Sequence, residues 1–219
     1  LTKIGLGTVQ WGLDYGISNN GGITPASEVK KILKRAKELG ICVLDTAPTY
    51  GSAESKIGEN KNLNSFRIIS KTIHFNHNES IQDFTNSLHA SIQILGGKQL
   101  YGVLFHRPKI LLDPNGMERW AVLESFKRRG LIKKIGVSIY TGDEILKLFP
   151  KYPIDVIQVP LNVFDQRLIK QGHLKKLKDG GVEIHARSIF LQGLLLMTPE
   201  RWPKYFLPFL KKLRAWHTL

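Results

Sequence analysis

The sequence of 219 residues is poor in several features that mark particular classes of protein. It has one cysteine, Cys42, which excludes an internal disulfide framework and is typical of a reducing compartment. Its apolar stretches are interrupted, as the stretch 189–197 is by Gln192 and Gly193, so none reaches the ~18 residues of a membrane span. The first residues carry no signal-peptide pattern. We therefore expect a cytoplasmic protein that does not enter a membrane.

Acidic residues are scarce beside basic ones, with 18 Asp and Glu against 32 Lys and Arg and a formal net charge of +14. The basic residues cluster in successive helix-like segments, at 30–37, 128–129, 175–178 and 211–214. This spread is typical of the solvated outer faces of helices, and a general attraction for anionic small molecules is the second interpretation. The sequence has no basic arm and no interleaved aromatic stacking motif, so we expect no nucleic-acid partner.

Short β-branched runs alternate with amphipathic segments along the chain. The predicted strands are residues 4–9, 41–46, 67–72, 101–106, 134–138, 156–159 and 182–186. The predicted helices are residues 25–39, 52–59, 80–95, 117–129, 143–149 and 167–178, and a basic amphipathic segment runs from 204 to the end. This alternation indicates βαβ units and a parallel sheet.

A parallel sheet of this kind is either a doubly wound open sheet or a closed barrel. The dinucleotide signature of the open sheet, Gly-x-Gly-x-x-Gly, is missing, because Gly5-Leu-Gly7 is followed at position 10 by Gln10. Polar residues instead end five different predicted strands: Asp45, Lys71, His106, Ser138 and Gln158. Convergence of residues from many strand ends is how a (β/α)8 barrel builds its active site. We therefore predict an α/β fold, a (β/α)8 TIM-type barrel, as a single domain over residues 1–219.

The eighth strand and helix are missing from this pattern. Such barrels take roughly 250 residues, and an open barrel would leave two unpaired strand edges. We therefore expect the domain to be incomplete at its C-terminal end, or to be closed by a partner.

Four side chains of complementary chemistry fall at or just after neighbouring strand ends: Asp45, Tyr50, Lys71 and His106. Adjacent strands lie ~5 Å apart, so these groups can meet. A lysine held charged by a carboxylate would favour the phenolate of the tyrosine and lower its pKa from ~10. A histidine aimed at the same point can hydrogen-bond a carbonyl oxygen. The set predicts proton delivery to a developing alkoxide, although each residue taken singly has an ordinary structural explanation.

These residues resemble the motifs of the aldo-keto reductase family. The run Asp45-Thr-Ala-Pro-Thr-Tyr50-Gly51 is similar to its Asp-Thr-Ala-x-x-Tyr-Gly signature, and it is followed by Ser-Ala-Glu54. Ser70-Lys71 resembles the family's third-strand lysine, and Leu104-Phe-His106-Arg-Pro108 its fourth-strand histidine. The resemblance runs from Gly5 to about Leu196. It implies reversible NADPH-dependent reduction of aldehydes and ketones, with Tyr50 as general acid, Lys71 and Asp45 tuning it, and His106 orienting the substrate carbonyl.

The resemblance also implies a set of contacts to cofactor and substrate. Gly7, Thr8 and Asp45 would border the nicotinamide ribose, and Trp11, Tyr50 and His106 would contact the substrate. Ser138 and Gln158 would hold the carboxamide, although the family's common asparagine after that serine is here Ile139. The loop of Arg187, Ser188, Phe190, Gln192 and Gly193 would wrap the pyrophosphate. NADPH is the implied cofactor, and NADH stays open because the family's contacts to the 2′-phosphate follow strand eight.

Arg187 departs from the family pattern, because many members carry an aromatic ring there. It can stack on the nicotinamide, where its charge would disfavour the oxidised ring, or it can be a salt-bridged structural residue.

Two further groups of residues and one alternative function complete the predictions. His74 and His77 lack a third ligand, so we expect no metal site. We expect Trp202, Phe206 and Trp216 to pack the last helix rather than line a substrate mouth. The alternative to a reductase acting on a small carbonyl compound is a regulatory barrel that binds the nicotinamide cofactor with little turnover. The sequence leaves the substrate and the oligomeric state open.

Overall fold

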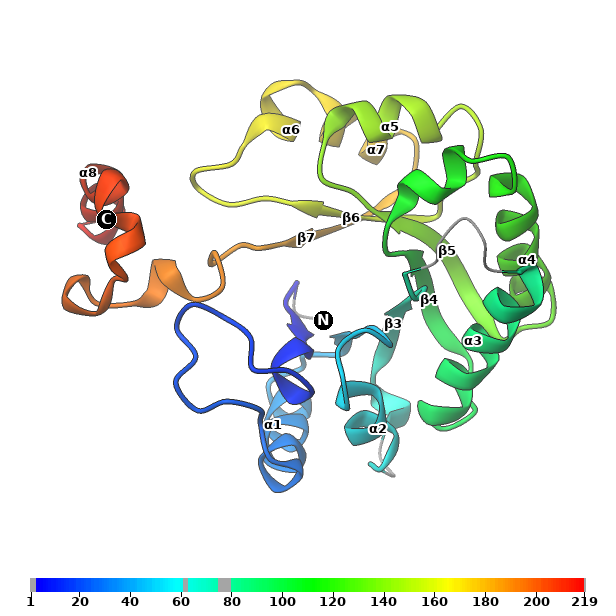
Figure 1. Ribbon diagram of the computed structural model, residues 1–219, viewed down its shortest axis with the longest axis horizontal. Helices are drawn as coiled ribbons and strands as arrows, with labels where there is room; N and C mark the ends of the chain where they lie inside the picture. The colour runs from blue at the N-terminus through cyan, green and yellow to red at the C-terminus, as the bar shows by residue number, and fades with distance from the viewer. Residues whose placement is uncertain (1–2, 61–62, 75–79, 219) are drawn as a thin grey trace.

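The chain forms a curled, wholly parallel sheet with helices on its outer side (Figure 1). The computed structural model describes residues 3–60, 63–74 and 80–218. The seven strands are β1 (Gly5–Gly7), β2 (Val43–Asp45), β3 (Arg67–Lys71), β4 (Leu100–Phe105), β5 (Ile132–Ser138), β6 (Val156–Pro160) and β7 (Glu183–Arg187). Each strand pairs in parallel with the next along the chain, and within the described residues β1 and β7 do not pair with each other. This confirms the predicted α/β architecture of the (β/α)8 type, with the seven predicted strands in it.

Helices follow the strands in the predicted order and surround the sheet (Figure 1). They are α1 (Ala26–Glu38), α2 (Ala53–Gly58), α3 (Ile81–Ile94), α4 (Gly116–Arg128), α5 (Gly142–Leu148), α6 (Arg167–Lys170), α7 (His173–Asp179) and α8 (Leu210–His217). Short 3₁₀ segments cover Val9–Trp11, Leu63–Ser65, Pro108–Leu112, Leu194–Leu196, Pro199–Arg201 and Lys204–Phe209. Most predicted boundaries are within two residues of those observed, because the apolar periodicity that predicted the elements is also what packs them.

The single helix predicted over 167–178 is wrong. It is two short helices, α6 and α7, because Gly172 between them adopts φ +75°, a left-handed conformation that ends the first helix. Leu168 and Leu177 still reach the core from the two pieces, which explains why the apolar pattern looked continuous.

Two apolar layers hold the sheet. The larger lies between strands and helices, where Phe84 and Leu88 of α3 pack against the outer faces of the strands. A small inner layer of Ile69, Leu104 and Val156 fills the concave side of the curl. Alternate residues of each strand therefore face either the helices or the interior, and the polar residues at strand ends are carried on the inner face.

The C-terminal segment packs on a core of its own and lies away from the ring of helices (Figure 1). Leu194, Leu195 and Leu213 are buried there, with Trp202, Phe206 and Trp216 packed against them. The prediction that these aromatic side chains pack the last helix is confirmed.

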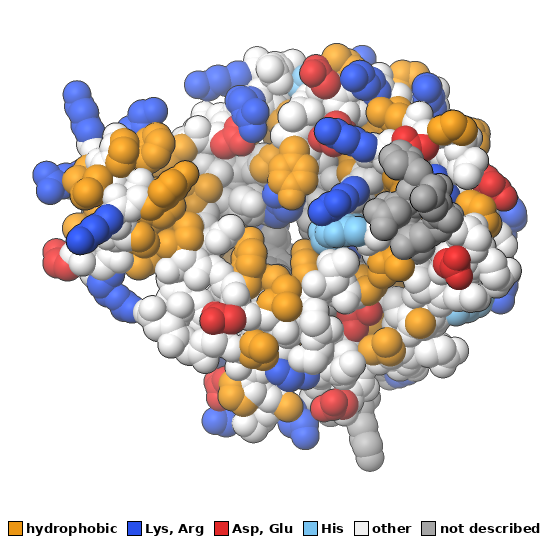
Figure 2. Space-filling view, in the orientation of Figure 1, with side chains coloured by type: hydrophobic (Ala, Val, Ile, Leu, Met, Phe, Trp, Pro, Cys, Tyr) orange, Lys and Arg blue, Asp and Glu red, His pale blue; other side chains and the backbone are white. Residues whose placement is uncertain are grey.

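The basic clusters lie on the surface. The lysines and arginines at 30–37, 128–129, 175–178 and 211–214 are all exposed, as the first interpretation of the charge predicts. Figure 2 shows Lys and Arg side chains spread around the surface of the molecule. No helix in the described ranges is both long and apolar enough to cross a membrane.

Candidate active site

The loop after β2 is folded tightly against the loop after β1, and this places Tyr50. A Cβ added at Gly12 would lie 1.8 Å from the Tyr50 carbonyl oxygen, so only glycine permits this approach. Gly51 has φ +56°, and a Cβ there would meet the Gly12 carbonyl oxygen at 2.3 Å. Lys56 then ties α2 to the first loop by donating to the carbonyl oxygens of Trp11 at 2.7 Å and Thr24 at 2.8 Å. The tyrosine therefore rests on a rigid support.

Lys71 ends β3 with its side chain 1% exposed, inside the sheet. Its Nζ donates to Asp45 Oδ1 at 2.8 Å and to the Thr46 carbonyl oxygen at 2.8 Å. The same nitrogen lies 4.9 Å from the centroid of the Tyr50 ring. The structure thus brings together the acid, the amine and the phenol that the sequence singled out. We call Asp45, Tyr50, Lys71 and His106 the tyrosine–lysine site.

The pKa of Tyr50 departs from the expected direction. Burial raises the pKa of the phenol above 10, whereas the charge of Lys71 and its hydrogen bond to the hydroxyl lower it. The predicted lowering is therefore wrong for the net value, because desolvation of the phenolate outweighs the nearby ammonium. The consequence is a phenol that keeps its proton at neutral pH.

His106 follows β4 and reaches the same point from the next strand. Its backbone N–H donates to Thr72 Oγ1 at 3.2 Å, and its Nδ1 lies 3.3 Å from Thr49 Oγ1. Its ring meets Tyr50 edge-on at 5.9 Å between centroids. Burial, together with the charge of Lys71, lowers the pKa of His106 to about 4. The imidazole is therefore neutral near pH 7.

A polar chain continues from Asp45 across the sheet. Gln158 Nε2 on β6 donates to Asp45 Oδ1 at 2.8 Å, and Ser138 Oγ on β5 donates to Gln158 Oε1 at 3.3 Å. Four of the five predicted strand-end residues are thus joined in one hydrogen-bonded network: Lys71, Asp45, Gln158 and Ser138. The fifth residue, His106, is not part of it. Ser138 and Gln158 are both buried.

The segment after β7 has an unusual backbone. Ser188, Leu191 and Gln192 have φ of 60°, 47° and 56°, and Gly193 has φ 90°. Left-handed residues of this kind can turn successive N–H groups toward one point, which makes concavities that bind anions. The segment touches the loop after β1, where the Ser18 N–H donates to the Gln192 carbonyl oxygen at 3.3 Å. Phe190 in the same segment is half exposed.

Arg187 is held in place without a carboxylate. Its guanidinium donates to the Ile139 carbonyl oxygen at 2.9 Å and to Ser188 Oγ at 3.3 Å, and it stacks on the Tyr140 ring at 4.2 Å. Among the described residues it has no acidic partner, so the salt-bridged interpretation finds no support.

The residues at the end of β1 divide into two groups. Gly7 is opposite Asp45 in the strand register, and a Cβ there would meet no atom within 4 Å, which leaves open space beside the site. Thr8 Oγ1 donates to the Asp45 carbonyl oxygen at 3.0 Å. Trp11 is only 4% exposed and belongs to the large core, so its ring supports the loop. Its contact with substrate stays a prediction.

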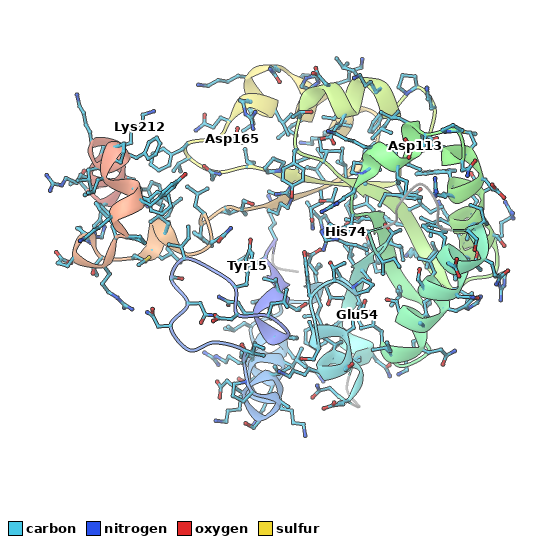
Figure 3. All side chains as sticks on the ribbon, in the orientation of Figure 1. Tyr15, Glu54, His74, Asp113, Asp165 and Lys212 are labelled. Carbon is cyan, nitrogen blue, oxygen red and sulfur yellow. The ribbon has the colours of Figure 1, made fainter. Side chains whose placement is uncertain are left out.

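Sequence reasoning gave no role to three polar residues near the site. Thr49 and Thr72 contact His106, and Glu54, which is 3% exposed, accepts hydrogen bonds from Ser70 Oγ at 2.5 Å and Ser91 Oγ at 2.7 Å. Burial raises the pKa of Glu54. Glu54 comes three residues after the signature run and Ser70 precedes Lys71, so their sequence positions were the available signal. Figure 3 shows Glu54 on α2, with Tyr15 and His74 on facing sides of the central opening.

In the part of the chain that the structure describes, no three His, Cys, Asp or Glu side chains gather as a metal-binding group. His77, one of the two histidines considered above, lies outside the described residues.

Comparison with known proteins agrees with this geometry. The model of the Aldo/keto reductase family matches residues 3–206. The NADH-specific methylglyoxal reductase of Escherichia coli is 28% identical over 92% of this chain, and the chain spans 67% of that relative's length.

Solved structures with a similar fold include aldo-keto reductases. An aldo-keto reductase from Pseudomonas aeruginosa is 25% identical with a TM-score of 0.70, covering 87% of this chain and 75% of its own. A Gox0644 variant in complex with NADPH shares the fold, with 22% identity, a TM-score of 0.65 and coverage of 90% and 66%. With the family model matched over nearly the whole sequence, this chain belongs to the aldo/keto reductase family.

Proposed function

We propose that the protein reduces an aldehyde or ketone to the alcohol with NADPH or NADH, and that Tyr50 donates the proton to the carbonyl oxygen. The observation that supports this most directly is the position of Lys71, whose Nζ is bonded to Asp45 Oδ1 at 2.8 Å and faces the Tyr50 ring at 4.9 Å. A phenol that is protonated at neutral pH can act as the acid, and the adjacent ammonium stabilises the phenolate left behind.

The other side chains of the tyrosine–lysine site have separate roles in this proposal. Asp45 holds the Lys71 amine in place through their hydrogen bond, while the contact of Thr49 with one nitrogen of His106 orients the imidazole ring. A neutral His106 donates an N–H to the carbonyl oxygen and so fixes the substrate beside the Tyr50 hydroxyl. Acid and hydrogen-bond donor then act on the same oxygen from two neighbouring strands.

The residues present fit a nicotinamide dinucleotide. Open space beside Gly7 adjoins the site. In the left-handed segment after β7, the N–H groups of Ser188 and Gln192 would be the ones offered to a pyrophosphate, because those of Leu191 and Gly193 already donate to backbone carbonyl oxygens. Ser138 and Gln158 would hold the carboxamide, for which Gln158 must release part of its contact with Asp45. The bound dinucleotide supplies the hydride.

We propose either NADPH or NADH as the cofactor, because the similar proteins differ in the dinucleotide that their names give. The Escherichia coli relative is named as NADH-specific, whereas the Gox0644 structure contains NADPH. The unbroken pairing from β1 to β7 supports treating the chain as one domain.

The test is steady-state oxidation of NADPH and of NADH with a panel of small aldehydes that includes methylglyoxal, together with Tyr50→Phe. We expect kcat to fall roughly 10²–10⁴-fold in the variant, the usual contribution of a general acid, while cofactor binding measured by fluorescence titration is retained. Undiminished turnover in Tyr50→Phe would reject the assignment. Cofactor binding with no turnover of any carbonyl by the unaltered chain would favour the regulatory barrel instead.

A further inference from the structure

The rim of the site next to His106 carries the positive charge of Arg107. Arg107 directly follows His106 and is exposed, and among the described residues its guanidinium has no carboxylate partner. His74, on the loop after β3, packs its ring against that of His106 at 4.7 Å between centroids, with the two ring planes tilted by 48°. Figure 2 shows histidine and Lys or Arg side chains side by side at the edge of the central hollow.

Asp45, the carboxylate that acts on His106, is already paired. Asp45 is paired with Lys71 and also accepts from Gln158, so it cannot offset a further cation. Arg107 is the next residue after His106, whose ring contacts that of His74, and its charge contributes to lowering the pKa of both histidines. Arg187, on the other side of the opening, also lacks an acidic partner among the residues described. The local field at the mouth is therefore positive, in the same sense as the net charge of +14.

We infer that the preferred substrates are carbonyl compounds carrying a carboxylate or another anionic group, which Arg107 binds while His106 holds the carbonyl oxygen and His74 borders the pocket. This inference rests on the proposed function and extends it to the class of substrate. A guanidinium presents a planar set of donors that matches a carboxylate, and a free one adjacent to the reacting group binds the anion at a fixed distance from the carbonyl.

The experiment compares two substrates that differ only in charge: para-carboxybenzaldehyde and its methyl ester. We expect kcat/KM to be higher for the acid, and the ratio of the two values to fall roughly tenfold in Arg107→Gln, the order expected for a charged hydrogen bond. Arg107→Lys should keep most of the preference. Lys109→Gln, which removes one exposed lysine from the following 3₁₀ segment, is the matched control and should leave the ratio unchanged. Added salt should lower kcat/KM for the acid more than for the ester.

Binding of benzoate and of methyl benzoate, measured by calorimetry, gives an answer that does not depend on turnover. Tighter binding of benzoate that is lost in Arg107→Gln supports the inference even if neither aldehyde is reduced, in which case only the proposed reaction fails. Equal kcat/KM for acid and ester with equal binding of the two ligands, or a preference unchanged in Arg107→Gln, would overturn it.

Discussion

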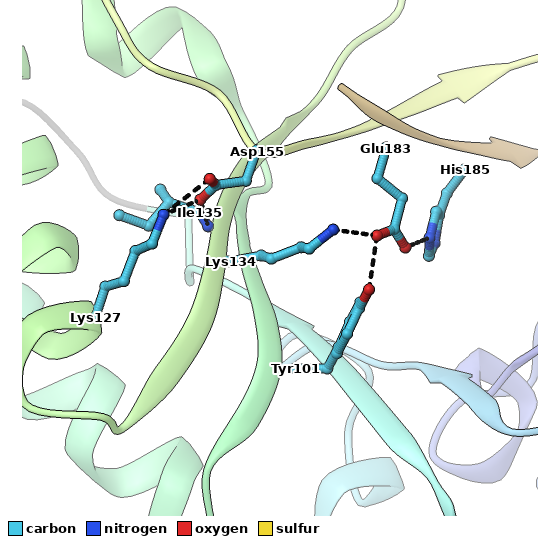
Figure 4. A network of polar contacts seen from close by, with 7 residues as sticks. All are labelled: Tyr101, Lys127, Lys134, Ile135, Asp155, Glu183 and His185. Atoms are coloured by element: carbon cyan, nitrogen blue, oxygen red, sulfur yellow. Dashed lines mark hydrogen bonds and ion pairs between the residues drawn. The ribbon is translucent and has the colours of Figure 1, made fainter. Parts of the chain in front are cut away.

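Two clusters inside the same sheet use the same four kinds of side chain and differ in how they connect them. The tyrosine–lysine site lies at the C-terminal ends of the strands. A second set, which we call the glutamate cluster, lies toward the opposite end and consists of Tyr101, Lys134, Glu183 and His185 (Figure 4). Each has one carboxylate, one lysine, one tyrosine and one histidine.

In the glutamate cluster every group is bonded to the carboxylate. Tyr101 Oη donates to Glu183 Oε2 at 2.6 Å, Lys134 Nζ pairs with the same oxygen, and His185 Nε2 is 2.6 Å from Oε1. These hydrogen bonds hold the pKa of Glu183 down at about 2, although burial acts in the opposite direction. All three partners bind one carboxylate, so this arrangement ties β4, β5 and β7 together.

In the tyrosine–lysine site the carboxylate bonds the lysine but neither the phenol nor the imidazole. Asp45 is satisfied by Lys71 and Gln158, while Tyr50 and His106, both partly exposed, are not bonded to it. The comparison shows that residue composition alone does not distinguish the two clusters. What differs is which side chains the carboxylate binds and which it leaves for other partners.

The largest expected effect comes from removing the lysine of each cluster. Lys71→Met should lower kcat by roughly 10²–10⁴-fold, because the phenolate loses its stabilising cation. Lys134→Met, its counterpart in the glutamate cluster, should keep kcat within about threefold and lower stability instead. Steady-state kinetics with thermal melts of both variants checks this. Equal losses of activity would remove the distinction drawn here.

The next effect is on stability in acid. Because the folded pKa of Glu183 is about 2, below its ordinary 4.5, ionised Glu183 contributes stability that is present above that ordinary value and lost as pH falls through about 2. Urea unfolding at several pH values should show Glu183→Gln less stable at pH 7, by about 1–3 kcal/mol, with the difference shrinking toward pH 2. A difference independent of pH would contradict the role given to this carboxylate.

The next prediction concerns Glu54, a buried carboxylate that contacts the residue before Lys71. Glu54→Ala should cost about 1–3 kcal/mol, because the Ser70 and Ser91 hydroxyls lose a buried acceptor. The raised pKa means that neutral Glu54 is favoured by folding and that this contribution is lost as pH rises through the folded pKa. The stability of Glu54→Gln relative to the unaltered chain should therefore be greater at pH 8 than at pH 4. Urea midpoints for both variants at the two pH values test this.

The smallest expected effect is a change that should be nearly absent. With the pKa of His106 at about 4, roughly nine tenths of the imidazole is still neutral at pH 5, so kcat/KM should change little between pH 7 and pH 5 through this group. An ordinary histidine of pKa ~6.5 would be mostly charged at pH 5. An acid limb centred near 6.5 that disappears in His106→Gln would show that burial does not lower this pKa.

Much of the candidate site could be predicted from the sequence because its residues lie in short sequence motifs. Asp45 ends β2 and Tyr50 lies in the loop that follows it, and Lys71 and His106 each lie at the end of a predicted strand. The parallel alternation alone therefore predicts that the four residues share one end of the sheet. The element order and the exposed lysine faces followed from periodicity for the same reason.

Other features depended on contacts between residues far apart in sequence. The net pKa of Tyr50 is set by how deeply it is buried, the core position of Trp11 by the packing of α2 against the first loop, and the glutamate cluster by the register of β4, β5 and β7. A pattern of residue types along a chain fixes which face of a strand is apolar, and thus the kind of fold. Desolvation and the pairing of particular polar atoms arise only when the strands lie side by side in the folded sheet. They decide how the tyrosine–lysine site differs from the glutamate cluster, although both contain the same kinds of side chain.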